Sequence, residues 1–162
     1  MATVFLGLGS NIEPRRYIQS ALKKLRVVFG ELRVSPVYKS AAVGFDGAPF
    51  LNLVVEIKTD VAVHVLSARL RKIEDELGRD RAQPKFSART IDIDILLYGD
   101  EVGVIDGVTL PRSEILKNAF VLCPLADLAP ERLHPIAKQS YQSLWENYDR
   151  ERQPVKQVEA LA

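Results

Sequence analysis

Two aspartates, Asp92 and Asp94, stand two positions apart in an otherwise apolar run, residues 91–97. On a β-strand, side chains two apart point to the same face, so both carboxylates share one face and the intervening isoleucines take the other. Aspartate is depleted in strands and a buried, unpaired carboxylate is costly, so the pair calls for an arginine, solvent or a hard cation. Carboxylates at this spacing suit one or two Mg²⁺ ions completed by substrate phosphates, whereas a solvated edge strand is the alternative explanation.

The segment directly before this run, residues 79–89, is polar and strongly basic. It carries four cations against the single carboxylate of Asp80, namely Arg79, Arg81, Lys85 and Arg89. Arginine offers planar, bidentate contacts to phosphate oxygens, and a long cationic loop without apolar periodicity is a candidate lid. Taken alone, the segment is explained at least as well by a solvated charged loop. Next to the two aspartates, it predicts a site for a polyphosphate–Mg²⁺ complex.

Other patterns exclude several kinds of site. No G-x-x-x-x-G-K-[ST] motif occurs, which excludes a P-loop. Residues 7–10, Gly-Leu-Gly-Ser, resemble the start of a dinucleotide-binding fingerprint, but the third glycine is absent and Pro14 follows, so we interpret them as a tight turn. The single cysteine, Cys123, excludes an internal disulfide and a cysteine-based zinc site. His64 and His134 have no ligand partners nearby in sequence, and we interpret both as surface or packing residues.

Length and composition describe an ordinary globular chain. The 162 residues are 47% hydrophobic and 27% charged, so we expect one domain over 1–162 with its own core. The formal net charge of +1 gives no general attraction to nucleic acid or anionic membranes, and we expect neither as a partner. The N-terminus lacks the basic and apolar regions of a signal peptide, and no run reaches the ~20 apolar residues of a membrane span. We therefore expect a cytoplasmic protein.

Hydrophobic periodicity predicts the elements that must position the aspartates. The expected order is a strand over 3–8, a helix over 14–29, an irregular or edge strand within 31–43, a strand over 50–58, a helix capped by Asp60 and closed by Gly78, and a strand over 91–98. This β-α-β-β-α-β order is that of an α+β, ferredoxin-like fold, an antiparallel sheet with both helices on one face. The other face must be covered by later elements or bind a ligand.

The rest of the chain predicts C-terminal helices. Residues 113–128 are expected to be mostly helical with an interruption at Pro124, because proline lacks the backbone donor that a helix interior needs. A short amphipathic helix is expected over 141–148. After Arg150 the chain is polar, and we expect residues 151–162 to form a frayed tail.

The segment 85–96, Lys-Phe-Ser-Ala-Arg-Thr-Ile-Asp-Ile-Asp-Ile-Leu, closely resembles the signature of the 6-hydroxymethyl-7,8-dihydropterin pyrophosphokinase family. Residues 6–11, 37–40, 50–52 and 120–125 resemble further segments of that family, and the resemblance runs in unbroken order over residues 2–135. It implies a ferredoxin-like αβα sandwich, in agreement with the element order above. It also implies transfer of a diphosphate from ATP to the hydroxymethyl group of the pterin, with release of AMP, in folate biosynthesis.

The resemblance implies a role for each matching residue. Asp92 and Asp94 would bind two Mg²⁺ ions that bridge the phosphates of ATP. The catalytic residues implied are Arg81, Arg89, Asp92 and Asp94. The ATP-binding residues expected are Glu74, Arg81, Lys85, Arg89 and Ile95, together with Arg112, which departs from the family pattern. The pterin-binding residues implied are Ser40, Ala41, Val43, Phe50, Asn52, Phe86 and Phe120, with loops 39–49 and 79–90 closing over both substrates.

Several positions depart from the family pattern. Phe86 stands where the family commonly has Trp, Ser87-Ala88 where it has Gly-Pro, and Phe50 where it has Tyr. Arg112-Ser113 stand where the family usually has His-Tyr, and Asn118 where it has Arg. Relative to the family pattern, position 112 gains a cation and position 118 loses one, both near the expected nucleotide. Because arginine is always charged and reaches further than an imidazole, we expect Arg112 to take over part of the missing contact.

Two alternatives stay open at the level of sequence. A non-catalytic ferredoxin-like module could bind nucleotide or RNA on its sheet, since aromatic residues and a basic loop suit RNA. Acidic side chains on that face argue against it, because they repel phosphate unless a cation intervenes. A family member that has drifted to a related pterin, or has lost activity, is the other alternative. For the chain itself we expect a monomer that acts on small molecules.

Overall fold

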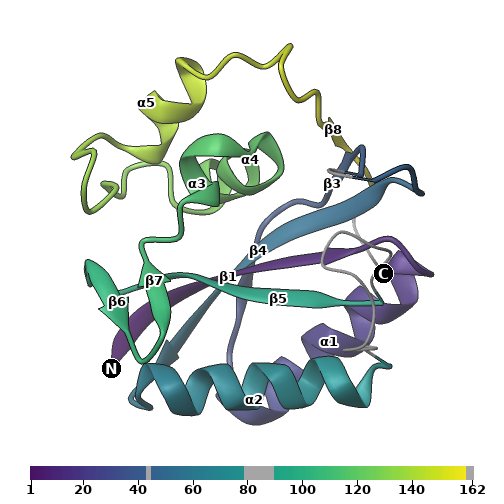
Figure 1. Ribbon diagram of the computed structural model, residues 1–162, viewed down its shortest axis with the longest axis vertical. Helices are drawn as coiled ribbons and strands as arrows, with labels where there is room; N and C mark the ends of the chain where they lie inside the picture. Colours follow the sequence, from purple (N-terminus) through teal and green to yellow (C-terminus); the bar gives the residue numbers. More distant parts are fainter. Residues whose placement is uncertain (43–44, 79–89, 160–162) are drawn as a thin grey trace.

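The computed structural model describes residues 1–42, 45–78 and 90–159 (Figure 1). Its elements, in chain order, are β1 (Ala2–Ser10), α1 (Pro14–Phe29), β2 (Arg33–Val34), β3 (Tyr38–Ser40), β4 (Phe50–Thr59), α2 (Val63–Glu76), β5 (Asp92–Tyr98), β6 (Gly103–Ile105), β7 (Val108–Leu110), α3 (Glu114–Lys117), α4 (Ala119–Leu128), α5 (Tyr141–Glu146) and β8 (Lys156–Gln157). The main sheet has the order β5-β1-β4-β3-β8, and β2 also pairs with β4. The paired strands are antiparallel.

Helices cover both faces of this sheet. Helices α1 and α2 lie along one face, and α3, α4 and α5 lie over the other (Figure 1). Two buried apolar clusters correspond to these layers, because successive strand residues alternate between the faces. In β1, Leu6 and Leu8 point into the cluster beneath α1 and α2, whereas Phe5 belongs to the cluster beneath α4. The predicted ferredoxin-like fold, with both crossover helices on one face, is confirmed.

The C-terminal segment is part of the sheet. In β8, Lys156 pairs with Lys39 and Gln157 pairs with Tyr38 of strand β3. The backbone N–H of Val158 also donates to the carbonyl of Val37 at 2.9 Å. The expected frayed tail is therefore wrong as far as residue 159, and residues 160–162 lie outside the described part of the chain. The physical reason is that β3 would otherwise leave an edge of unpaired backbone groups, which an added strand satisfies.

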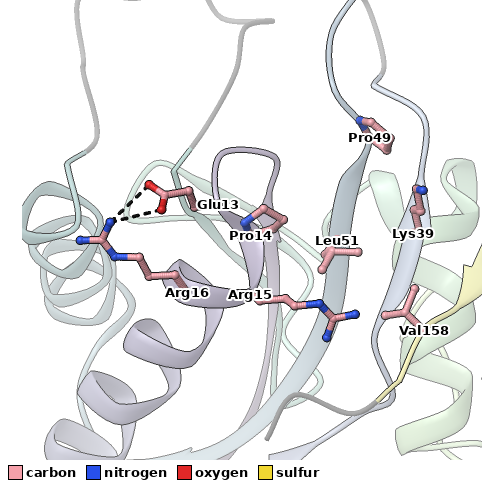
Figure 2. A pocket seen from close by; sticks show the side chains of 8 residues that line it. All are labelled: Glu13, Pro14, Arg15, Arg16, Lys39, Pro49, Leu51 and Val158. Atoms are coloured by element: carbon pink, nitrogen blue, oxygen red, sulfur yellow. Dashed lines mark hydrogen bonds and ion pairs between the residues drawn. The ribbon is translucent and has the colours of Figure 1, made fainter.

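A cavity of about 560 Å³ opens where α1 begins, next to β3, β4 and β8 (Figure 2). Its lining residues are Glu13, Pro14, Arg15, Arg16, Lys39, Pro49, Leu51 and Val158. Lys39 and Leu51 are opposite each other in the β3–β4 ladder, and Leu51 belongs to the cluster on the α1 face. The cavity therefore lies on the opposite face of the sheet from the neighbouring residue Asn52.

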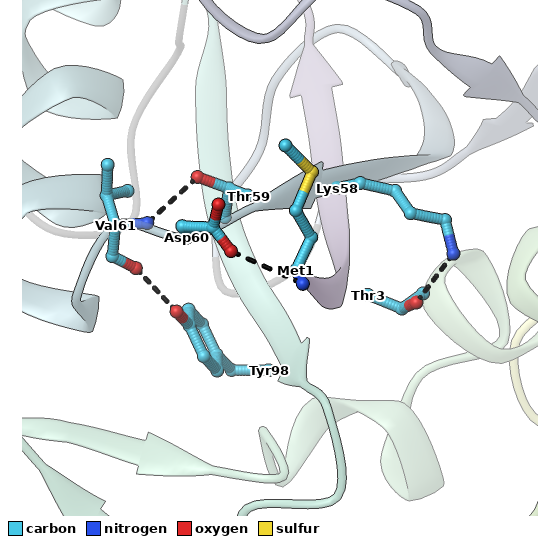
Figure 3. A network of polar contacts seen from close by, with 7 residues as sticks. All are labelled: Met1, Thr3, Lys58, Thr59, Asp60, Val61 and Tyr98. Carbon is cyan, nitrogen blue, oxygen red and sulfur yellow. Dashed lines mark hydrogen bonds and ion pairs between the residues drawn. The ribbon is translucent and has the colours of Figure 1, made fainter.

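The end of the sheet at which the chain begins is held by polar contacts (Figure 3). Asp60 binds the terminal amino group of Met1 at 3.3 Å and does not cap helix α2, whose N-cap is Ala62. The prediction of an Asp60 cap is therefore wrong. The backbone turns first, with the hydroxyl of Thr59 accepting a hydrogen bond from the N–H of Val61, so Asp60 lies outside the first helical turn.

The helical region after β7 breaks at a different place from the one predicted. Asn118 is extended, with φ −112° and ψ 121°, and separates α3 from α4. Pro124 lies inside α4, although a proline there removes one helical hydrogen bond. Helix α4 tolerates this loss because most of its residues are buried against the sheet and α5. The predicted helix over 141–148 is confirmed as α5.

Candidate active site

The acidic pair lies on β5, the end strand of the sheet order. Asp92 is opposite Gly9 of β1, and Asp94 is opposite Gly7. Ile93 and Ile95 point to the other face and belong to the core beneath α1 and α2. Both aspartates are half-buried and lie on the face that α4 covers only in part. The prediction that both carboxylates share one face is confirmed.

Gly7 and Gly9 lie within strand β1, so their interpretation as a tight turn is wrong. They separate the acidic pair on β5 from Asn52 and Val54 on β4, which are their partners on the other side. A Cβ atom added to Gly9 would lie 3.1 Å from the Oδ1 atom of Asn52. Gly9 therefore leaves bare backbone between Asp92 and Asn52, where a substrate can lie against the sheet, whereas Gly7 is covered by the buried side chain of Leu96.

Arg112 reaches the acidic pair from the segment after β7. Its Nη2 atom lies 3.5 Å from Oδ1 of Asp94, and its Nε atom lies 3.3 Å from Oε2 of Glu114. Its backbone N–H donates to the carbonyl of Leu96 at 2.9 Å, which fixes the start of the side chain beside β5. The sequence placed Arg112 near the nucleotide but gave no sign of its contact with Asp94, which is remote in the chain.

Asp94 is electrostatically unusual. Burial, and then the neighbouring charge of Asp92, raise the pKa of Asp94 to about 7, while Arg112 acts in the opposite direction. Two adjacent carboxylates on one partly buried face make it costly to ionise both. A site of this kind is suited to a bound cation, which stabilises both ionised carboxylates.

The donor set fits Mg²⁺. Among the described residues, no group of three or more histidine, cysteine or acidic side chains forms a complete metal site. Mg²⁺ needs no such cage, because it keeps several waters and is bound by one or two carboxylates together with substrate phosphates. Asp92 and Asp94 could supply such carboxylates on a half-buried strand face next to Gly9.

Two further residues predicted to bind nucleotide lie at β5. Glu74, on α2, is buried, and its Oε2 atom accepts a hydrogen bond of 2.7 Å from the N–H of Ile93. The side chain of Ile95 is buried in the core, so only its backbone is available to a ligand. Alternate residues of a strand direct their backbone polar groups to the same edge, so those of Ile95 share the outer edge with Ile93.

The residues predicted to bind the pterin are grouped at β3, β4 and the start of α4. Asn52 is buried, and its amide donates to the hydroxyl of Ser40 at 2.8 Å. Phe50 is half-buried and packs edge-to-face against Phe45, with ring centroids 6.3 Å apart. Phe120, also half-buried, lies at the second position of α4 and packs against the core of that layer. Ala41 follows β3 and is exposed.

Five predicted site residues lie outside the described part of the chain: Val43, Arg81, Lys85, Phe86 and Arg89. They include the basic segment and one of the two rings expected against the pterin. The described residues alone bring together an acidic end, at β5 and Arg112, and a neutral end, at Asn52, Ser40 and Phe120. The bare strip of backbone at Gly9 joins these two ends.

Comparison with known proteins agrees with this arrangement. The family model described as 7,8-dihydro-6-hydroxymethylpterin-pyrophosphokinase (HPPK) matches residues 5–130. The chain is 41% identical over 138 residues to the 2-amino-4-hydroxy-6-hydroxymethyldihydropteridine pyrophosphokinase of Aquifex aeolicus, covering 84% of this chain and 86% of the relative. It is 36% identical over 131 residues to the protein of the same name from Bacillus subtilis, covering 78% of each.

Solved structures agree at the level of fold. A crystal structure of HPPK-DHPS in complex with substrates matches with a TM-score of 0.71 and 13% identity, covering 93% of this chain. This chain spans 44% of that longer chain. The A437G variant of Plasmodium falciparum HPPK-DHPS matches with a TM-score of 0.75 and 14% identity. On the match to the family model and the identity to its named relatives, the chain belongs to the 7,8-dihydro-6-hydroxymethylpterin-pyrophosphokinase family and is an enzyme of the pyrophosphokinase class.

Proposed function

We propose that this chain transfers the diphosphate group of ATP to the hydroxymethyl group of 6-hydroxymethyl-7,8-dihydropterin, releasing AMP, as a step of folate biosynthesis. One observation of the structure supports this activity most strongly. A half-buried pair of carboxylates and a buried amide lie on one sheet face, separated only by two glycines. A polyphosphate and a flat polar ring can therefore be bound next to each other, each at an end with suitable chemistry.

At the acidic end, we assign Asp92 and Asp94 to two Mg²⁺ ions, which when bound would neutralise charge on the triphosphate. Arg112 lies beside these carboxylates and is assigned to the phosphates or ribose of ATP. Glu74 and the backbone of Ile95 are assigned to the nucleotide, along the outer edge of β5. The basic residues assigned to the phosphates are Arg81, Lys85 and Arg89, of which Arg81 and Arg89 act on the reacting group.

At the neutral end, we assign the pterin to the floor around Asn52. The amide of Asn52, held by Ser40, is positioned to hydrogen-bond the polar edge of the pterin. Phe120 and Phe86 are assigned to the two faces of the ring, and Phe50 to its border. The backbone of Ala41 and Val43 is assigned to the remaining edge.

The reaction that this arrangement serves is a direct displacement. The hydroxymethyl oxygen of the pterin attacks the β-phosphorus of ATP, and the bond from that phosphorus to the oxygen bridging the α-phosphate breaks, so AMP leaves. No side chain needs to be a strong base, because phosphoryl transfer depends mainly on positioning and electrostatic stabilisation. Closure of loops 39–49 and 79–90 would exclude water and so suppress simple hydrolysis of ATP.

Production of AMP from ATP, measured by chromatography with and without the pterin alcohol, tests this proposal. We expect AMP and the pterin diphosphate to appear in equal amounts, and only when pterin, ATP and Mg²⁺ are all present. AMP formation that ignores the pterin would contradict the proposed function. A chain that binds the pterin but forms no AMP would favour a drifted relative.

The other partners follow from the same reasoning. We propose a cytoplasmic monomer. The net charge of +1 supports the further proposal that it has no nucleic-acid or membrane partner. Within the described ranges, the helices are too short or too polar to cross a membrane. The alternative of an RNA-binding module is not favoured, because the curated relatives are named pyrophosphokinases.

A further inference from the structure

We propose that Gln153, in the C-terminal segment 149–158, is a positioning residue for the pterin end of the site. It fixes the start of helix α4, and with it the ring of Phe120. This inference rests on the proposed function in one respect, namely that Phe120 contacts the pterin. It concerns a part of the chain beyond residues 5–130, which the family model matches.

The side-chain amide of Gln153 makes two contacts at the break between α3 and α4. Its Oε1 atom accepts a hydrogen bond from the backbone N–H of Ala119 at 3.0 Å, and its Nε2 atom donates to Oδ1 of Asn118 at 3.0 Å. Both ends of the amide are therefore used. Gln153 itself is half-buried, so these bonds are partly shielded from water.

Helix α4 needs such a contact. The first backbone N–H groups of a helix have no partner within the helix, and usually the side chain of the N-cap residue accepts from one of them. The N-cap of α4 is Asn118, whose side chain makes no capping hydrogen bond. Gln153 takes over this function from a distant part of the chain. At position 118, where the family commonly has arginine, the side chain is thus held by the C-terminal segment.

The segment that carries Gln153 is anchored on both sides. Before it, the hydroxyl of Tyr148 donates to the carbonyl of Lys117 at 2.7 Å, and the guanidinium of Arg150 lies over the ring of Trp145 at 4.7 Å. After it, β8 pairs with β3, the strand that contains Ser40. The segment therefore spans from the start of α4 to β3, two elements of the pterin end.

The effect of Gln153 is local to the first turn of α4. The far end of this helix is held separately, because the hydroxyl of Tyr38 donates to the carboxylate of Asp127. Phe120 follows Ala119 directly, so a shift of the first turn moves its ring. Since substrate positioning within about 1 Å can change a rate by two orders of magnitude, a misplaced ring should weaken pterin binding and leave nucleotide binding intact.

Three variants test this role. Gln153→Leu keeps the approximate size of the side chain and removes both hydrogen bonds. Gln153→Glu keeps an oxygen for the N–H of Ala119, and a turned-over amide of Asn118 can donate to the second oxygen. Gln142→Leu is the matched control, because Gln142 is exposed on α5 and its side chain contacts only Glu146 among the described residues.

The measurements are calorimetric binding of the pterin alcohol, binding of Mg²⁺ with a non-hydrolysable ATP analogue, and steady-state AMP production. For Gln153→Leu we expect pterin affinity to fall about tenfold, because binding must then supply the free energy of ordering the first turn of α4, while affinity for the ATP analogue changes less than about twofold. Gln153→Glu should restore pterin affinity, and Gln142→Leu should match the wild type. A general loss of stability would lower both affinities together.

Each remaining outcome decides between the proposals. Unchanged pterin affinity in Gln153→Leu, with a wild type that makes AMP only with the pterin, would overturn the role of Gln153 alone. A wild type that binds the pterin but makes no AMP would overturn the proposed function, and the binding comparison would still test Gln153. If Gln153→Leu fails to fold, Gln153→Asn replaces it, because the shorter side chain cannot make both contacts. The proposal then requires that Gln153→Asn bind the pterin more weakly than Gln153→Glu does.

Discussion

The two ends of the site are stabilised in opposite ways. At β5, Asp94 forms an ion pair with Arg112, and burial and the adjacent charge of Asp92 raise the pKa of Asp94. At β3 and β4, Asn52 is buried and already hydrogen-bonded to Ser40. The acidic end therefore places two carboxylates where ionising both is costly, whereas the neutral end is preorganised by contacts within the protein.

This difference predicts how strongly the binding of the pterin and of ATP should each depend on Mg²⁺. A preorganised pterin end should bind its ligand with little help, because its polar groups are already oriented. An acidic end with two adjacent carboxylates should bind a triphosphate more strongly when Mg²⁺ is present. Substitutions at the two ends should accordingly separate nucleotide binding from pterin binding, and the following predictions test that separation.

The largest effect is expected from removing a carboxylate charge. Asp92→Asn and Asp94→Asn preserve the shape of the side chain but weaken an oxygen-ligand site, so turnover should fall about a thousandfold or more. Pterin binding, measured by calorimetry without nucleotide, should change little. Folding is checked by circular dichroism. Near-normal turnover in both variants would rule out the two-metal role.

Sequence reasoning located the acidic end more completely than the neutral one, for physical reasons. The alternation of Asp92, Ile93 and Asp94 is a local signal, since strand geometry alone assigns each side chain to a face. Gly7 and Gly9 were interpreted as a turn, because their role depends on the neighbouring strands β4 and β5, which are remote in sequence.

The C-terminal segment was interpreted as frayed for a similar reason. Its residues are polar and carry no periodicity, and its order depends on partners elsewhere in the chain. Gln153 contacts Asn118, 35 positions away, and β8 pairs with β3 at the other end of the sequence. One sequence cannot show such pairs. The order β-α-β-β-α-β could be predicted because each element carries its own apolar pattern.

The next largest effect concerns Arg112. Arg112→Ala removes the cation closest to the acidic pair that the structure describes, and should weaken binding of Mg-ATP by about 2 kcal/mol, the range for a hydrogen bond to a charged group. Pterin affinity should be unchanged. Titration at low salt measures both constants, and Arg26→Ala, at an exposed position of α1 on the opposite face of the sheet, serves as a control for loss of one surface charge. Unchanged Mg-ATP affinity would mean that Arg112 pairs with Asp94 and does not contact the nucleotide.

A smaller effect is expected at the bare strip between the two ends. Gly9→Ala would place a methyl group 3.1 Å from Oδ1 of Asn52, on the face where the substrates meet. We expect kcat/KM for the pterin to fall about tenfold, because the added methyl group projects toward the substrates and displaces the side chain of Asn52. Gly7→Ala is the comparison on the same strand: its Cβ would lie 3.3 Å from the buried side chain of Leu96 and away from Asn52, so it should act on stability and not on the pterin end. Equal losses in both variants would show that the contact with Asn52 is irrelevant.

The smallest effect concerns the free energy of unfolding. The substitution Asp94→Asn, which should abolish turnover, should make the metal-free protein more stable. The pKa of Asp94 is about 7 in the folded protein, against about 3.9 for an unfolded chain, so folding favours the protonated carboxyl. The corresponding contribution to stability is fully present below pH 4 and is lost as the pH rises through 7. Asp94→Asn should therefore stabilise the metal-free protein more at pH 8 than at pH 5.

Because the side chain of Asp94 is 37% exposed, solvent screening limits this difference to about 1 kcal/mol. Urea unfolding at both pH values, with a chelator present, measures it. Millimolar Mg²⁺ should then stabilise the wild type at pH 8 and leave the variant almost unchanged, since the ion relieves the same repulsion that the substitution removes. If the variant is no more stable than the wild type at pH 8, the acidic end is already balanced within the protein, and the contrast between the two ends of the site does not hold.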